Sequence, residues 1–119
     1  MQRNILMAGF AALALASLTP AAFAHAAMTH ASIADRASLP KAPENFTATF
    51  EHQTALASVT LTKSDGKTVT LGYKTSAAMA KSFTIPLPKL TRGGYTLSWK
   101  TVAKDGHAMK GAVHFTITG

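Results

Sequence analysis

From Phe46 onward, hydrophobic and polar residues alternate with a period of two, which is the pattern of β-strands with one buried face. Six segments show this alternation: 45–52, 57–62, 67–73, 83–87, 95–99 and 113–117. A further short strand is expected near residues 31–33, whereas residues 75–81 have no clear strand pattern. The sequence therefore predicts about seven strands.

Turn-forming residues separate these segments. Ser64-Asp65-Gly66 is a hairpin signal, Pro86 and Pro88 end a strand, and Arg92-Gly93-Gly94 and Asp105-Gly106 tolerate a positive φ. No helical pattern of ten to fifteen residues intervenes between the strands. Many short strands with regularly spaced turns favour a sandwich or a barrel, so we expect an all-β fold.

The first two dozen residues have the features of a secretory signal. Arg3 supplies a positive charge, and residues 5–18 form an uncharged apolar run that is too short to span a bilayer. The small-x-small triplet Ala22-Phe23-Ala24 then predicts cleavage after Ala24, which would leave His25 as the first residue. We expect residues 1–24 to be a cleaved signal peptide and residues 25–119 to be one domain, exported to the periplasm.

A second small-x-small frame, Ala24-His25-Ala26, overlaps the first and would instead leave Ala27 at the N-terminus. The pattern alone does not decide between the two sites. Every functional expectation that follows depends on this choice, because it determines whether His25 has a free amine.

The domain expected at residues 25–119 has no second apolar segment and no cysteine. We therefore expect a monomer without stable membrane insertion, held by its core, and thiolate metal sites are excluded. Without Arg3, eleven Lys or Arg residues face five Asp or Glu residues, a formal net charge of +6. The lysines are scattered over strand ends and turns without an arginine cluster, which argues against a nucleic-acid site.

Two of the five histidines occupy informative positions. As the mature N-terminus, His25 would offer its α-amine and its imidazole Nδ1 to the same metal ion. Because both donor atoms belong to one residue, bringing them together costs little conformational entropy. Tetragonal coordination by such nitrogen ligands suits Cu(II), which also outcompetes other divalent ions. An internal histidine has no amine to offer.

The second element is Asp105-Gly106-His107, which follows the strand around Tyr95 to Trp99. In an extended backbone, residues two apart face the same side, so the Asp105 carboxylate and the His107 imidazole could converge on one ion. The alternative is that Asp-Gly simply forms a turn with His107 in solvent, and the spacing alone leaves both interpretations open.

Taken together, several motifs make the chain resemble the CopC family of periplasmic copper-binding proteins over essentially the whole mature domain. The motifs are His25-Ala26, Ala42-Pro43, Thr49-Phe50-Glu51, Ile85-Pro86-Leu87, Gly94-Tyr95-Thr96-Leu97-Ser98-Trp99, Asp105-Gly106-His107 and Gly111-Ala112-Val113-His114-Phe115-Thr116. The combination of a histidine after the signal, the Gly-Tyr-Thr-x-x-Trp strand and the Asp-Gly-His segment is the most specific part.

The resemblance implies a Greek-key, Ig-like β-sandwich that binds one Cu(II) ion through the amine and imidazole of His25, through His107 and through Asp105. It implies a non-enzymatic role in copper sequestration, resistance or delivery, with an inner-membrane, CopD-like copper transporter as a partner. Some family members carry a methionine-rich loop for Cu(I). This chain has no methionine at its Ser64-Asp65-Gly66 hairpin, so we expect no separate Cu(I) site.

The remaining histidines have weaker assignments. His52 stands where relatives usually have another residue, and it is a candidate accessory ligand or hydrogen-bonding partner of the copper site. His30 is an odd number of positions from His25, so the two would face opposite sides of a strand. His114 alternates with the apolar Val113 and Phe115 and should lie on the outer face of its strand.

Two other functions remain open. A histidine-brace copper oxidase or monooxygenase also uses an N-terminal histidine and a second histidine, but a coordinating carboxylate and so small a domain argue against it. A metal-free, Ig-like interaction module with a basic surface becomes the leading interpretation if the mature chain begins at Ala27.

Overall fold

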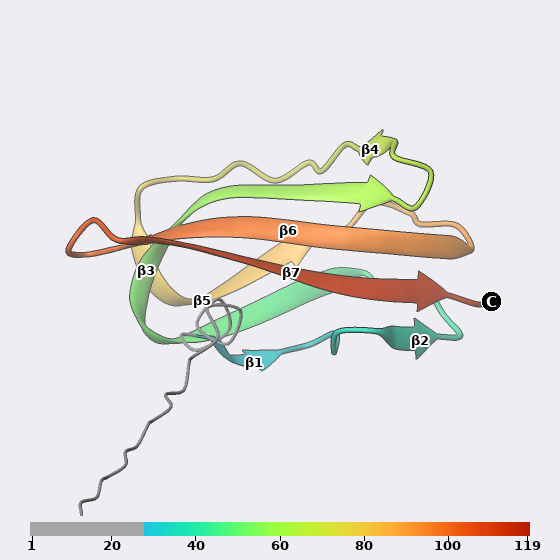
Figure 1. The fold of residues 1–119 in the computed structure, drawn as a ribbon, viewed down its shortest axis with the longest axis horizontal. Coiled ribbons are helices and arrows are strands. Elements are labelled where there is room, and N and C mark those ends of the chain that lie inside the picture. The colour runs from blue at the N-terminus through green and yellow to red at the C-terminus, as the bar shows by residue number, and fades with distance from the viewer. Residues whose placement is uncertain (1–27) are drawn as a thin grey trace, which may run out of the picture.

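The computed structural model describes residues 28–119, which form seven strands and no helix (Figure 1). The expected signal peptide, its cleavage site and His25 lie outside the described residues. Within residues 28–119, no helix has the length and hydropathy of a membrane span. The strands are β1 (Met28–Ala31), β2 (Ala37–Leu39), β3 (Asn45–Lys63), β4 (Thr68–Val69), β5 (Met79–Pro86), β6 (Gly93–Ala103) and β7 (Ala108–Ile117).

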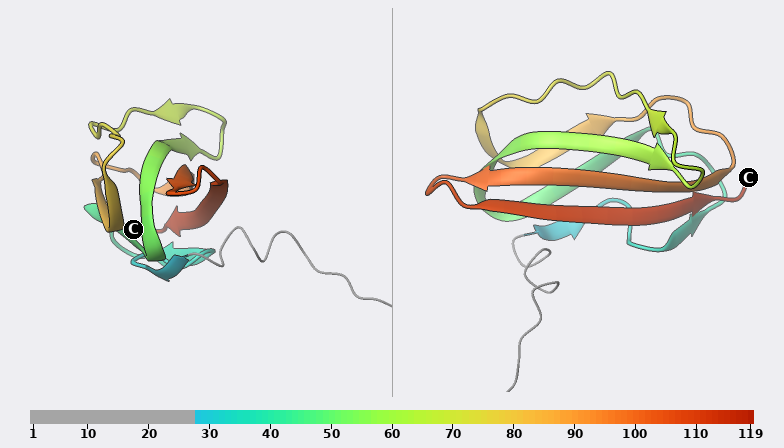
Figure 2. Two further views of the ribbon diagram at one scale, coloured as in Figure 1. Left: turned by 90° about the vertical axis from the view of Figure 1, so that its left-hand side faces the viewer. Right: turned by 45° about the horizontal axis from the view of Figure 1, so that its top comes forward.

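The long strand β3 belongs to both layers of the molecule. Its first part pairs with β1 and β5, and its second part pairs with β4 and β6. β7 pairs with the other side of β6, and the short β2 adds to β7 in parallel. In Figures 1 and 2, β3 curves around one end of the molecule, and the two layers enclose the core. The fold is the expected Greek-key, Ig-like β-sandwich.

The separation of residues 45–52 and 57–62 into two strands was wrong, because β3 runs through both. Phe46 and Phe50 are buried at even positions, as are Thr54 and Leu56, whereas Leu61 is buried at an odd position. The register of β3 against β6 shifts between Leu56 and Ser58, and this bulge reverses the inward-facing positions. In the sequence, this change of the buried positions from even to odd looks like the end of one strand, although β3 continues through it.

Other strand boundaries also differ from the predictions. The first strand lies at Met28–Ala31 rather than at 31–33, and the strand expected at 67–73 is reduced to Thr68–Val69. β5 begins at Met79, inside a segment that has no clear strand pattern. β2 was not predicted, because three residues are too few to show alternation; its position depends on pairing with β7, about 80 residues later.

The core is aromatic where the layers meet. Trp99 and Phe46 stack with their ring centroids 5.7 Å apart, and Tyr95 stacks on Phe115 at 5.6 Å. The Tyr95 hydroxyl donates a hydrogen bond to the carbonyl of Thr91 at 2.7 Å and accepts one from the Thr91 N–H at 3.1 Å. Trp99, Tyr95 and Phe115 are all buried in this core.

Candidate metal centre

The β6–β7 turn presents Asp105 and His107 to solvent. The turn is closed by two backbone hydrogen bonds, from the N–H of Gly106 to the carbonyl of Ala103 at 2.9 Å and from the N–H of Ala103 to the carbonyl of His107 at 2.8 Å. Gly106 has a φ of 90°, a left-handed conformation that side chains other than glycine rarely adopt. Asp105 and Gly106 therefore form a turn, which is the alternative that the sequence analysis left open.

The same turn also brings the Asp105 carboxylate and the His107 imidazole together. The N–H of His107 donates to Asp105 Oδ1 at 3.0 Å, and His107 Nδ1 lies 2.8 Å from Asp105 Oδ2. These hydrogen bonds, the backbone one first, hold the pKa of the Asp105 carboxyl below its ordinary value of 3.8. The carboxylate is thus ionised at neutral pH. The turn and the contact between the Asp105 and His107 side chains occur together.

The distance between these two groups is that of a charge-assisted hydrogen bond, and it is also compatible with a shared metal ion. Ligand atoms at about 2.0 Å from one divalent ion and about 90° apart around it are separated by about 2.8 Å. The separation of His107 Nδ1 and Asp105 Oδ2 has this value. Both side chains are largely exposed, with relative accessibilities of 83% for His107 and 64% for Asp105, so an ion can reach them without rearrangement of the core.

Two donors do not complete a metal site. Within residues 28–119, no group of three or more His, Cys, Asp or Glu side chains is placed to hold an ion. A site at the β6–β7 turn therefore requires donors from outside the described residues or a movement of side chains.

The start of β1 lies at the same end of the sandwich as this turn. Met28, the first described residue, pairs with Phe50 on β3. Four residues further along β3, Thr54 pairs with Ala103, which lies two residues before Asp105. His25 is three residues before Met28 in the sequence. His25 itself lies outside the described residues, so its place as a ligand stays a prediction.

His52 lies at the bend of β3, between the residue that pairs with β1 and the residue that pairs with β6. Its side chain is exposed, and its Nε2 is 3.5 Å from Glu51 Oε1. It also lines a small apolar cavity of about 110 Å³ together with Met109. The structure places His52 at the same end as Asp105, and its role as an accessory ligand or partner stays a prediction.

His30 is exposed, and so is His114, as expected for its place on the outer face of a strand. His114 also pairs with Asp35, which the sequence analysis did not predict. The N–H and the Nδ1 of His114 lie 2.7 and 3.0 Å from Asp35 Oδ1, and they hold the pKa of this carboxyl below its ordinary value. The partners are 79 residues apart, so no local spacing could have revealed a pair that resembles Asp105 and His107.

A family model for the CopC domain matches residues 28–118. The YobA proteins of Escherichia coli K12 and Shigella flexneri are each 32% identical over 111 residues, which covers 90% of this chain and 90% of the relative. No function is implied by that name.

Solved structures show the same fold. CopC from Methylosinus trichosporium OB3b superposes with a TM-score of 0.67 at 25% identity, covering 79% of this chain and 94% of that one. PcoC, a copper resistance protein from Escherichia coli, superposes with a TM-score of 0.52 at 24% identity, covering 76% of this chain and all of that one. The family match spans nearly all described residues, and the chain therefore belongs to the CopC family.

Proposed function

We propose that the protein is exported to the periplasm, loses residues 1–24, and binds one Cu(II) ion through the amine and imidazole of His25, the Asp105 carboxylate and the His107 imidazole. The observation that carries the proposal is the Asp105–His107 pair, with a 2.8 Å separation, at the end of the sandwich where β1 begins. Membership of the CopC family and the likeness to a copper resistance protein support copper as the ion.

The four donors have the character that Cu(II) prefers. Three nitrogens and one carboxylate oxygen can occupy a tetragonal plane, and a preference for such ligands is typical of Cu(II). In the copper-free protein, His107 Nδ1 and Asp105 Oδ2 are at hydrogen-bonding distance. When Nδ1 of a neutral His107 binds the ion, the ring proton is carried on Nε2, whereas a protonated imidazole and a protonated His25 amine must each lose a proton. Binding therefore weakens as the pH falls.

We further propose that the protein sequesters copper or delivers it to an inner-membrane, CopD-like transporter, and that it is not an enzyme. A carboxylate from Asp105 in the metal plane fills the position that an oxidase or monooxygenase would leave open for a substrate or oxygen. The exposure of Asp105 and His107 on a turn suits transfer of an ion between proteins. Absence of peroxide-driven turnover by the copper form tests the non-enzymatic assignment.

The proposal is tested by the mass of the exported protein and by the EPR spectrum of its Cu(II) form. The expected mass is that of residues 25–119, and the expected spectrum is tetragonal with hyperfine coupling to three nitrogens. A mass that corresponds to a start at Ala27, together with loss of stoichiometric copper binding, would contradict the proposal.

The role of His52 needs a separate variant. His52→Ala should alter the EPR parameters or the copper affinity if His52 is a ligand or a hydrogen-bonding partner of the site. A spectrum and an affinity that match those of the wild type would remove His52 from the site and leave the other donors unaffected.

A further inference from the structure

One side of β7 has no strand beside it along the first half of the strand. β6 pairs with β7 from Ala108 to Ile117, whereas β2 pairs with the other side only at residues 115–117 (Figure 1). No Cα atom of β1 lies within 8 Å of a Cα atom of β7. Among residues 28–119, the stretch 108–113 is therefore a sheet edge without a second strand, which we call the β7 edge.

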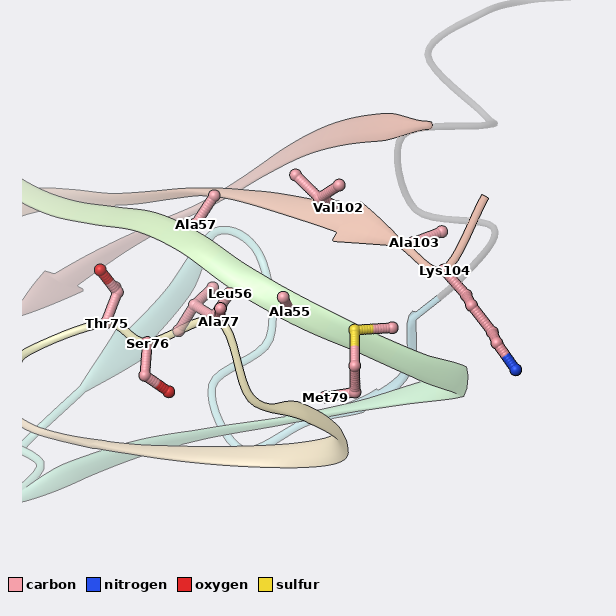
Figure 3. A pocket seen from close by; sticks show the side chains of 10 residues that line it. All are labelled: Ala55, Leu56, Ala57, Thr75, Ser76, Ala77, Met79, Val102, Ala103 and Lys104. Carbon is pink, nitrogen blue, oxygen red and sulfur yellow. The ribbon is translucent and has the colours of Figure 1, made fainter. Parts of the chain in front are cut away.

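The opposite edge of this layer is covered by the chain itself. Residues 70–78 pass beside β3 between its pairings with β4 and β5 (Figure 1). Leu71 and Tyr73 pack against the core, and residues 75–77 form a wall of an apolar groove of about 690 Å³ (Figure 3). A strand could join β3 there only by displacing this segment, whereas the β7 edge needs no such displacement.

The backbone of Lys110 and Ala112 points toward the open side of β7. His114 shows the direction, because its N–H donates to Asp35 Oδ1 at 2.7 Å and its carbonyl accepts the N–H of Arg36. In an antiparallel ladder this direction repeats at every second residue, and the register of β6 against β7 has no shift. The N–H and C=O groups of Lys110 and Ala112 therefore point away from β6, and no backbone hydrogen bond among the described residues occupies them.

The chain places a carboxylate of its own at one end of the β7 edge. Asp35 lies in the β1–β2 connection, accepts the backbone N–H of His114, and lies 3.0 Å from its Nδ1. An open pocket of about 400 Å³ extends from Asp35 along β7 to Lys110. The β7 edge can thus be reached from solvent, next to a backbone N–H that already holds an anionic group.

Two lysines without carboxylate partners lie on the outer face of the β7 edge. Lys100 on β6 and Lys110 on β7 are directly opposite each other and exposed, an arrangement that costs free energy through repulsion. Among the described residues, neither lysine makes a salt bridge. Asp35 and Asp105, the carboxylates at the two ends of this stretch, each contact a histidine instead. A partner segment with carboxylates beside Lys110 is therefore favoured over a basic one.

The inner face of the β7 edge offers an apolar contact. Gly111 has no side chain, and a Cβ there would lie 2.5 Å from Cζ2 of Trp99. Trp99 is buried, yet it lines the pocket beside β7. Successive side chains of a strand point to opposite faces of the sheet, so a strand beside β7 would present alternate residues to Lys110 and to Trp99. The two faces of the edge therefore favour a segment in which acidic and apolar residues alternate.

We propose that the β7 edge binds an extended segment of a partner protein in which acidic and apolar residues alternate. The segment adds a strand to β7, and its backbone pairs with the N–H and C=O groups of Lys110 and Ala112. Its carboxylates face Lys100 and Lys110, and an apolar side chain beside Gly111 contacts Trp99. Extended peptides commonly bind by adding a strand to an exposed sheet edge. The inference goes beyond copper binding and uses none of the proposed metal ligands.

The test uses copper-free, ¹⁵N-labelled protein and a capped nine-residue peptide in which glutamate alternates with valine. One reference peptide replaces glutamate by lysine, and a second has the same composition with its glutamates and valines grouped. The alternating acidic peptide should bind about tenfold more tightly than the lysine peptide and about threefold more tightly than the grouped one. It should also shift the amide resonances of residues 108–112 and change the fluorescence of Trp99, the single tryptophan of the chain.

Because no copper is present, this result is independent of the proposed metal site. Shift changes confined to residues outside the β7 edge would overturn the inference. Equal binding of the alternating acidic peptide and either reference peptide would overturn it as well.

Two variants separate the contributions of backbone and charge. Ala112→Pro removes an N–H that points away from β6, a position at which an edge strand tolerates proline, and should weaken binding of the acidic peptide roughly fivefold. Lys110→Glu should weaken it about fivefold at low salt. The matched control is Lys41→Glu, an exposed lysine beyond the end of β2, which should change binding less than about twofold. If Ala112→Pro does not fold, the lysine variants decide, and equal effects of the two would contradict the proposal.

The β7 edge could instead pair with a second copy of this chain, although the excess of positive charge on each copy disfavours that pairing. In that case, the amide shifts of residues 108–112 would depend on protein concentration without any peptide, and the sedimentation coefficient would rise with concentration. Concentration-independent shifts and a monomer are the results expected for the peptide site. Self-association through residues 108–112 would overturn the assignment to a partner protein.

Discussion

Asp105→Asn separates the role of Asp105 in the turn from its role at the metal. The asparagine side chain keeps an oxygen that can accept the N–H of His107, the bond that measures 3.0 Å in the wild type. It loses the anionic oxygen that lies 2.8 Å from His107 Nδ1. The turn should therefore persist, while the charge and the fourth donor are removed.

The expected loss of copper affinity follows from these contacts. Loss of a group that only orients a metal ligand costs about 10–100-fold, and a direct ligand should cost at least as much. We expect Asp105→Asn to weaken Cu(II) binding by about 10–100-fold or more.

The assay is a competition titration with a chromophoric copper chelator at fixed pH, together with thermal unfolding of the copper-free proteins. Asp35→Asn is the matched control, because Asp35 makes the same two types of contact with His114. His114 is seven residues beyond His107, a distance of roughly 20 Å along the strand. Equal affinity losses in the two variants, or no loss in Asp105→Asn, would refute the assignment of Asp105.

Three further predictions concern the stability of the copper-free domain. A Cβ on Gly111 would lie 2.5 Å from Cζ2 of the buried Trp99, so Gly111→Ala should destabilise by about 1–3 kcal/mol in denaturant unfolding, whereas Gly72→Ala, with open space around it, should change stability by less than about 0.5 kcal/mol. Tyr95→Phe removes a hydroxyl that bonds a backbone carbonyl at 2.7 Å and should cost about 1–2 kcal/mol in the same assay. The contacts with His114 lower the pKa of Asp35 in the folded protein, so the ionised carboxylate stabilises the fold above pH 3.8, and this contribution is lost as the pH falls through the folded-state pKa. The difference in unfolding free energy between wild type and Asp35→Asn should therefore shrink below about pH 4. A difference that stays constant with pH would contradict this prediction.

The sequence predicted the fold class because the burial alternates along the strands. Leu97 and Trp99 on β6 and Val113 and Phe115 on β7 are buried at every second position, and the apolar pattern reports this directly. The prediction failed at β3, because its bulge between Leu56 and Ser58 reverses the pattern without ending the strand. Alternation reports which face is buried, and it does not report whether a ladder continues.

The candidate site could be predicted only where it is local. Asp105 and His107 are two residues apart, so the sequence could indicate that their side chains meet, and they lie 2.8 Å apart, although on a turn rather than on the extended backbone that was expected. Their role as metal ligands stays a prediction. Asp35 and His114 form a similar pair, but their contact requires the β1–β2 connection, which carries Asp35, to lie beside β7. A contact between segments 79 residues apart depends on the tertiary fold, and single-sequence patterns do not contain it.

In the proposed mature protein, peptide-bond cleavage before His25 creates two of the copper ligands. The most direct test is a Cu(II) titration of two purified chains, residues 25–119 and residues 27–119, monitored by chelator competition. The longer chain should bind one equivalent of Cu(II), more than about 100-fold more tightly than the shorter one, because it alone carries the amine and imidazole of His25. Equal affinities in the two chains would contradict the account.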